Sequence, residues 1–125
     1  MKSRDSPVYE SDHMKAAQVR DFESKKNPHN VDSRVIYDTD KAMIVHIMLK
    51  PGEALRRHIT PVDVAFYVLE GRGTVEIGEE RAEAGSDTII ESPARIPHRW
   101  VNNGPGILRV LVMKLPRPTE NTIVL

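Results

Sequence analysis

The stretch PGEALRRHITPVDVAFYVLEGRG, residues 51–73, decides how this chain folds. It opens on a Pro-Gly turn, passes His58, and continues into the apolar run VAFYVL before closing on Gly71 and Gly73. Glycine and proline supply the backbone conformations that strand reversals need, and a short apolar run between two such turns is typical of a β-strand. We therefore predict a strand over the run VAFYVL, with His58 just ahead of it.

The same pattern of short apolar runs separated by turn residues continues on both sides of this stretch. Short apolar or alternating runs, such as AMIVHIML and ILRVLVM, are separated by turn-rich segments such as EAGS, ESPARIP and NNGPG. Spacing of this kind, with a turn signal about every ten residues, is typical of an antiparallel sandwich or barrel. A chain of 125 residues suffices for one such domain. We predict a single all-β barrel over residues 31–116.

The two ends of the chain are expected to lie outside the barrel. Residues 1–30 are polar, with one short helix-compatible piece between Met14 and Phe22, so we predict an irregular or partly helical N-terminal arm. Residues 117–125 form a C-terminal tail that ends in the apolar letters IVL. The tail is expected to add an edge strand, either in its own chain or exchanged with a second subunit.

Composition excludes several classes of protein. Eighteen Lys and Arg residues balance eighteen Asp and Glu residues, so no net charge draws the chain to nucleic acid or to an anionic membrane. The absence of cysteine excludes disulfides, thiolate metal sites and a cysteine nucleophile. No run approaches membrane-spanning length, and no signal-peptide pattern is visible. We expect a cytoplasmic protein with neither nucleic acid nor membrane as its partner.

Two motifs in this chain resemble those of the cupins, a family of small double-stranded β-helix or jelly-roll barrels. In the first motif, Gly52 is followed after five residues by His58, and Gly71 closes the motif at the family's spacing. The second motif is matched by SPARIPHRWVN, which contains Pro93 and His98. The resemblance implies a small single-domain cupin barrel.

The first motif departs from the pattern of the metal-binding cupins. Those proteins use two histidines and a glutamate from the first motif and one histidine from the second. Carried over to this chain, the pattern gives His58 and His98, whereas Thr60 and Val64 replace the other two donors. A divalent transition ion needs about four to six donors, so two imidazoles alone would hold it weakly. The resemblance implies a weakly bound divalent ion (Zn, Ni, Mn or Fe), with no metal as the alternative.

Three other residues are candidates for completing a metal site. His46 lies in the apolar run MIVHIML, and the preceding strand of a barrel can bring it near His58 as a third ligand. Its alternatives are a solvent-facing histidine or a buried one bonded to a carbonyl. Asp63 is disfavoured because neighbouring residues on a strand face opposite sides. His29 would contribute only if the arm folded over the barrel mouth, and we expect it to be exposed instead.

Strand alternation selects the residues expected to line a pocket beside the two imidazoles. Arg56 is the expected partner of a carboxylate through two parallel hydrogen bonds, with a solvated strand start as its alternative. Trp100 is expected either to face the ligand or to lie in the core or at a dimer interface. The predicted ligand-binding lining is Arg56, Thr60, Val64, Phe66 and Trp100, joined by Val68 and Ile96.

These features predict a small cupin-barrel protein that binds a small polar or carboxylate-bearing molecule, with an incomplete His-based metal site. The alternative is a metal-dependent enzyme of the oxygenase, decarboxylase or isomerase type with an unusual ligand set. A third reading is a barrel retained for dimerisation, and a homodimer is expected in each case. No nucleophile elbow, ordered triad or phosphate loop is visible, so catalytic residues are not identified and enzymatic activity stays open.

Overall fold

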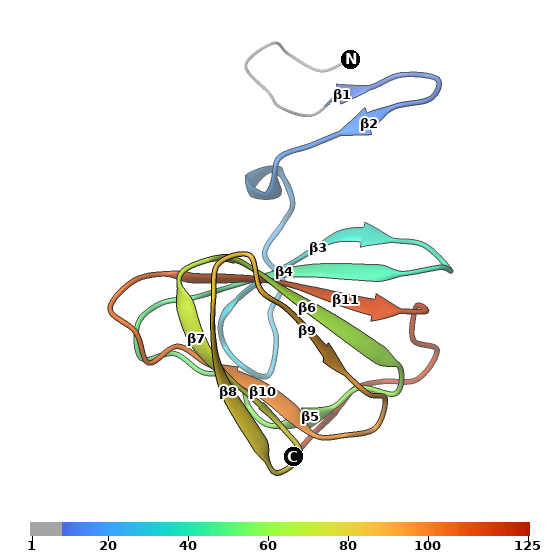
Figure 1. Cartoon of the computed structure of the whole chain (residues 1–125). Helices are drawn as coiled ribbons and strands as arrows, with labels where there is room; N and C mark the ends of the chain where they lie inside the picture. Colours follow the sequence, from blue (N-terminus) through green and yellow to red (C-terminus); the bar gives the residue numbers. More distant parts are fainter. Residues whose placement is uncertain (1–8) are drawn as a thin grey trace.

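In the computed structural model, which describes residues 9–125, two five-stranded antiparallel sheets lie face to face as the walls of a barrel (Figure 1). One sheet has the order β12-β5-β10-β7-β8 and the other has the order β3-β4-β11-β6-β9. The all-β barrel predicted from the sequence is confirmed. In chain order the strands are β1 (Tyr9–Glu10), β2 (Lys15–Ala16), β3 (Asp32–Asp38), β4 (Met43–Leu49), β5 (His58–Ile59), β6 (Asp63–Glu70), β7 (Arg72–Ile77), β8 (Glu80–Gly85), β9 (Ile89–Ser92), β10 (His98–Val101), β11 (Leu108–Leu115) and β12 (Ile123–Val124).

The core lies between the two sheets because alternate residues of each strand point inward. On β6, Val64, Phe66 and Val68 are buried while their neighbours are more exposed. Trp100 of β10 is fully buried and meets Phe66 edge to face, with ring centroids 5.7 Å apart. This aromatic contact joins the two sheets and fills the middle of the barrel.

The turn after β6 explains the glycine that ends the decisive stretch. Gly71 has φ of +84°, in the left-handed region, and an added Cβ would collide with the backbone carbonyl of Ile107. Both the conformation and the close approach require glycine at this position. The turn therefore fixes where β6 stops and β7 crosses to the other sheet.

The arm and the tail take different paths. Strands β1 and β2 form a small hairpin that projects away from the barrel, and a single 3-10 turn, Val19–Asp21, follows it (Figure 1). The chain then returns to the barrel, where the Arg34 guanidinium donates hydrogen bonds to the carbonyls of Arg20 and Phe22. The tail adds β12 to the edge of β5 in the same chain. Within residues 9–125 no helix is long and apolar enough to cross a membrane.

Candidate functional site

The two motif histidines meet on neighbouring strands. His58 of β5 and His98 of β10 are directly paired in the antiparallel register, and both side chains are buried. Their ring centroids lie 4.6 Å apart, with the ring planes at 72°. The structure thus brings together the imidazoles that the motif spacing indicated.

His98 is engaged at both ring nitrogens. Nδ1 lies 2.7 Å from the Ser92 hydroxyl, and Nε2 lies 3.2 Å from the Thr60 hydroxyl. Burial, together with the charges of His58 and Lys114, lowers the pKa of His98 from 6.5 to about 3. His98 is therefore neutral near pH 7, and Thr60 occupies one of its nitrogens as a hydrogen-bond partner.

The tautomer of His58 follows from its hydrogen bond. Nδ1 lies 2.8 Å from the carbonyl oxygen of Arg56, and a carbonyl only accepts, so Nδ1 carries the proton. Burial lowers the pKa of His58, the Arg56 carbonyl opposes that shift, and Lys114 adds to it. The neutral ring therefore has its lone pair on Nε2.

His29 joins this pair from the arm, contrary to our expectation that it would be exposed. Its Nδ1 accepts a hydrogen bond of 2.8 Å from the backbone N–H of Arg56, and its ring centroid lies 4.9 Å from that of His58. Burial, helped by positive charge nearby, lowers the pKa of His29 from 6.5 to about 4. Because Nδ1 accepts, neutral His29 presents an Nε2–H donor. The folding of the arm over the barrel mouth is the physical reason for the correction.

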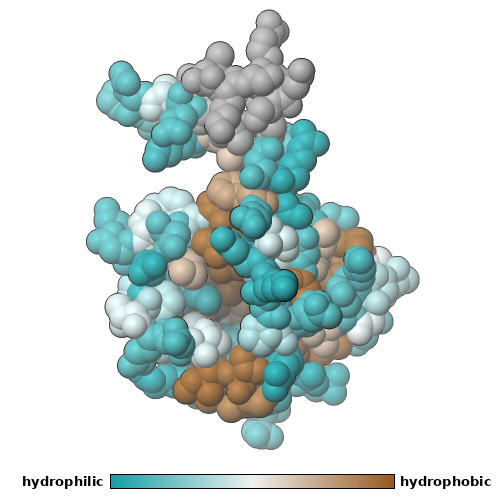
Figure 2. All heavy atoms as spheres, turned by 180° about the vertical axis from the view of Figure 1, so that it is seen from behind, coloured by the Kyte–Doolittle hydropathy of each residue, from teal (hydrophilic) through white to brown (hydrophobic). Residues whose placement is uncertain are grey.

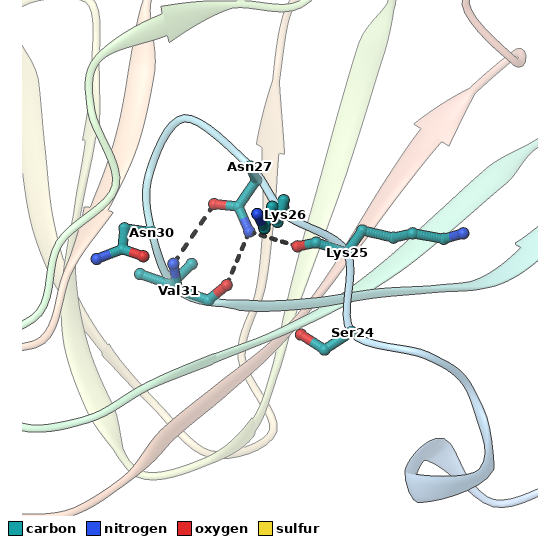
Figure 3. Close-up of a pocket in the computed structure, with 6 residues that line it drawn as sticks. All are labelled: Ser24, Lys25, Lys26, Asn27, Asn30 and Val31. Carbon is teal, nitrogen blue, oxygen red and sulfur yellow. Dashed lines mark hydrogen bonds between the residues drawn. The ribbon is translucent and has the colours of Figure 1, made fainter.

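Asn27 holds the loop from which His29 comes, through hydrogen bonds to Lys25 and Val31 (Figure 3). The Asn27 side-chain oxygen accepts hydrogen bonds from the backbone N–H groups of His29, at 3.1 Å, and Val31, at 3.4 Å. Its amide nitrogen donates to the carbonyls of Lys25 at 2.9 Å and Val31 at 2.7 Å. One side chain thus satisfies four backbone groups of the loop, as asparagine commonly does in turns.

Replacing Asn27 with alanine is expected to free this loop and His29 with it. Loss of the hydrogen bonds to partly buried backbone groups should lower the free energy of unfolding by about 1–3 kcal/mol. Urea unfolding measures the loss, and an NMR titration should show the pKa of His29 moving up from about 4 toward 6.5. Lys26→Ala, on the same loop with an exposed side chain, is the matched control. An unchanged His29 titration in Asn27→Ala would contradict the role given to Asn27.

Lys114 is a site residue that the sequence analysis missed. On β11 the buried positions alternate as Leu108, Val110 and Val112, and Lys114 continues this inward-facing row. Its charge acts on the imidazoles of His29, His58 and His98, and burial lowers its own pKa. The period of two along β11 was the signal that could have identified it.

His29, His58 and Lys114 line a cavity of about 550 Å³ at the barrel mouth. Seen from behind, the surface has an apolar recess bordered by hydrophilic residues (Figure 2). The lining described by the structure contains lysine and histidine but no aspartate or glutamate. The basic part of the lining is Lys25, Lys26, His29, His58 and Lys114, and the apolar part is Val31, Val35, Met43, Val45, Ile47, Leu55, Val112 and Val124.

Several residues that the sequence analysis expects to line a pocket do not line this cavity. Val64, Phe66 and Trp100 are core residues and do not line this cavity. Thr60 is buried against His98 and does not line it either. The aromatic rings and His98 fill the space between the sheets, since the Phe66 and His98 ring centroids are only 5.1 Å apart. The open volume is left beside β3, β4 and β11 instead.

Residues expected at the edge of that pocket have other roles. Arg56 is exposed, and its guanidinium donates a hydrogen bond of 3.2 Å to the carbonyl of Leu125, so it fastens the tail. Ile96 is exposed, and Val68 is fully buried in the core. Lys114 instead lines the cavity together with His29 and His58.

His46 and Asp63 do not join the histidines. Val45 and Ile47 point into the cavity, so His46 between them faces the outer side of the sheet. There its Nε2 accepts a hydrogen bond of 3.0 Å from Arg109. Asp63 is exposed and accepts a hydrogen bond of 2.8 Å from the backbone N–H of Ala94.

The donors present do not fit a resident divalent metal ion. No group of three or more His, Cys, Asp or Glu side chains in the part of the chain that the structure describes is arranged to hold one. Both nitrogens of His98 are engaged with hydroxyl groups, and Val64 has no donor atom.

Comparison with known proteins agrees with this architecture. The sequence profile of the Cupin domain family matches residues 45–114, more than half of the chain. The chain therefore belongs to the cupin family, which confirms the resemblance drawn from the two motifs.

Individual relatives show how far the similarity extends. An uncharacterised protein of Methanocaldococcus jannaschii is 29% identical over 83 residues, which are 65% of this chain and 66% of that protein. A solved structure from Thermus thermophilus superposes with a TM-score of 0.72 at 26% identity, covering 84% of this chain and 100% of its own. The polyketide cyclase RemF from Streptomyces resistomycificus has a TM-score of 0.76 at 20% identity, covering 90% and 85% of the two chains. The likeness to RemF shows a shared fold.

Proposed function

We propose that this protein binds a small carboxylate-bearing molecule in the cavity at the barrel mouth. The observation that carries the proposal is the inward-facing Lys114, which lines the cavity with His29 and His58 and without any acidic side chain among the described lining residues. An ammonium that is partly removed from water ordinarily requires a negative partner. A bound carboxylate supplies that partner.

The neighbouring groups can contribute to recognition of the same ligand. His29 offers an N–H donor, since its other ring nitrogen accepts from the Arg56 backbone. Hydrogen bonds between charged and neutral groups of this kind fix the orientation of a carboxylate. The exposed Lys25 and Lys26 also border the cavity and favour the entry of an anion.

The wall that carries Lys114 also accepts an apolar substituent. Met43, Val45 and Val112 face the cavity from two neighbouring strands of one sheet. A mostly apolar cavity with a few placed polar groups is the usual form of a small-molecule site, and about 550 Å³ lies within the usual size range. We therefore propose organic acids with a short aliphatic or aromatic tail as the ligand class.

Ligand-induced stabilisation tests this function. Pyruvate, isovalerate and benzoate are expected to raise the midpoint of thermal unfolding, with a gain of about 2.7 kcal/mol at one hundred times the dissociation constant. Isovaleramide and benzamide have matched shapes without the charge and should have little effect. A chelator should leave the stabilisation intact. Equal stabilisation by acids and amides, or its loss on chelation, would reject the proposal.

A further inference from the structure

Lys114 differs from an ordinary ion-paired lysine. It lies on the inward row of β11 and lines the cavity, yet no aspartate or glutamate of residues 9–125 lies within ion-pair distance of its ammonium group. No hydrogen bond in that part of the chain involves its Nζ either. The nitrogen is thus free to meet a molecule that enters the cavity.

The surroundings of this nitrogen raise the fraction of its uncharged form above that of a lysine in water. Burial lowers the pKa of Lys114, and no carboxylate nearby opposes the shift. An uncharged lysine amine is a nucleophile that attacks carbonyl carbons, and enzymes create one by placing lysine in a poorly solvated pocket. Val112, two residues away on the same row, supplies part of that apolar surrounding.

We propose that Lys114 forms a reversible imine with the carbonyl group of a small 2-oxo acid bound in the cavity. This inference rests on the proposed binding of carboxylates. The carbonyl carbon of a 2-oxo acid is bonded directly to its carboxylate. A carboxylate attracted to Lys114 therefore brings the reactive carbon next to Nζ.

The step balances without any oxidant or reductant. The ammonium of Lys114 releases one proton to solvent, and the nitrogen lone pair forms a bond to the carbonyl carbon as the carbon–oxygen π bond opens. One of the two protons left on the nitrogen passes to the oxygen, and the Nε2–H of His29 in the same cavity is a hydrogen-bond donor for that oxygen. The second proton passes to the oxygen as the carbon–nitrogen double bond forms, and the oxygen leaves as water.

Reductive trapping tests this inference on the intact protein. Glyoxylate and pyruvate are added separately with cyanoborohydride, which converts an imine into a stable secondary amine, and peptide mass spectrometry locates the product. The adduct at Lys114 is expected to exceed that at the exposed Lys41 and Lys50 by roughly tenfold or more, because binding in the cavity raises the local concentration of the carbonyl. Lys114→Arg keeps the charge but removes the reactive amine, and Lys50→Arg is the matched control.

Ligand-induced stabilisation by isovalerate, which has no keto group, is measured on the same proteins. An adduct at Lys114 that disappears in Lys114→Arg but persists in Lys50→Arg would support the inference. Stabilisation by isovalerate without preferential labelling of Lys114 would overturn the imine and leave carboxylate binding in place. The absence of both would overturn both proposals.

Discussion

Replacing Lys114 with methionine is expected to weaken the binding of carboxylates by about ten- to one-hundredfold. A hydrogen bond to a charged group contributes about 1.5–3 kcal/mol, and about 1.4 kcal/mol corresponds to a tenfold change in affinity. Methionine has nearly the same length and shape without the charge, so the cavity should keep its form. Calorimetric titration with isovalerate or benzoate measures the loss.

The same substitution should raise the stability of the free protein. An ammonium in a poorly solvated position without a carboxylate destabilises the folded state, so its removal is expected to add about 1 kcal/mol to the free energy of unfolding. Because the folded pKa of Lys114 lies below 10.5, the unfolded chain holds this proton more tightly. The stability of the parent should therefore gain a contribution as the pH rises toward 10.5, and Lys114→Met should lose that contribution.

Two comparisons make this result specific. Lys50→Met, at an exposed turn position, should change neither binding nor stability appreciably. Lys114→Arg should retain much of the affinity because it retains the charge. If Lys114→Met bound isovalerate as tightly as the parent, Lys114 would have no part in recognising the acid.

The second large effect is a loss of stability in mild acid, which we expect because His98 is protonated more readily in the unfolded chain than in the folded one. In the folded protein its pKa is about 3, whereas an unfolded histidine titrates near 6.5. Between these values the unfolded chain binds a proton that the folded chain does not, so stability falls as the pH drops below 6.5. Each such group lowers the free energy of unfolding by about 1.4 kcal/mol per pH unit across its window.

His29 adds to this loss over the narrower interval from 6.5 to about 4. Urea unfolding at a series of pH values should therefore show a steeper decline for the parent than for His98→Gln. Glutamine can bond to the hydroxyls of Ser92 and Thr60 but does not titrate. The difference in slope between the two proteins should be about 1.4 kcal/mol per pH unit between pH 6 and pH 4.

A control histidine separates this effect from general acid denaturation. His13→Gln replaces an exposed histidine side chain on the arm and serves as the matched control. Protonation of carboxylates affects parent and variants alike, so it cancels in the comparison. Parallel profiles for the parent and His98→Gln would show that His98 is not held neutral by the fold.

The residues on the strands are the part of the site that motif spacing and strand alternation could predict. Gly52, His58 and His98 have the motif spacing of a cupin, and the resemblance to that family implies that the two imidazoles belong to one site. The structure pairs them on neighbouring strands. The inward direction of Lys114 was equally predictable, because Lys114 continues the alternation of Val110 and Val112 on one strand. Arg56 is a cation close to His58 in sequence, but Arg56 does not line the cavity, whereas Lys114 of β11 does.

Other features depend on contacts between distant segments. His29 reaches Arg56 across 27 residues of sequence, and no local pattern in the arm indicates that its loop folds over the barrel. The face on which His46 lies could not be assigned, because apolar residues flank it on both sides in MIVHIML. Either register of that strand would have satisfied the hydrophobic pattern.

By itself, the sequence determined the barrel, the turns and the direction of alternate side chains, because these follow from the preferences of neighbouring residues. Only the tertiary structure decided where the cavity opens and which basic groups line it. The position of the cavity depends on how Phe66, Trp100 and His98 fill the space between two sheets. Its basic lining depends on His29 and Lys114, which come from an arm and a strand that meet only when the chain has folded.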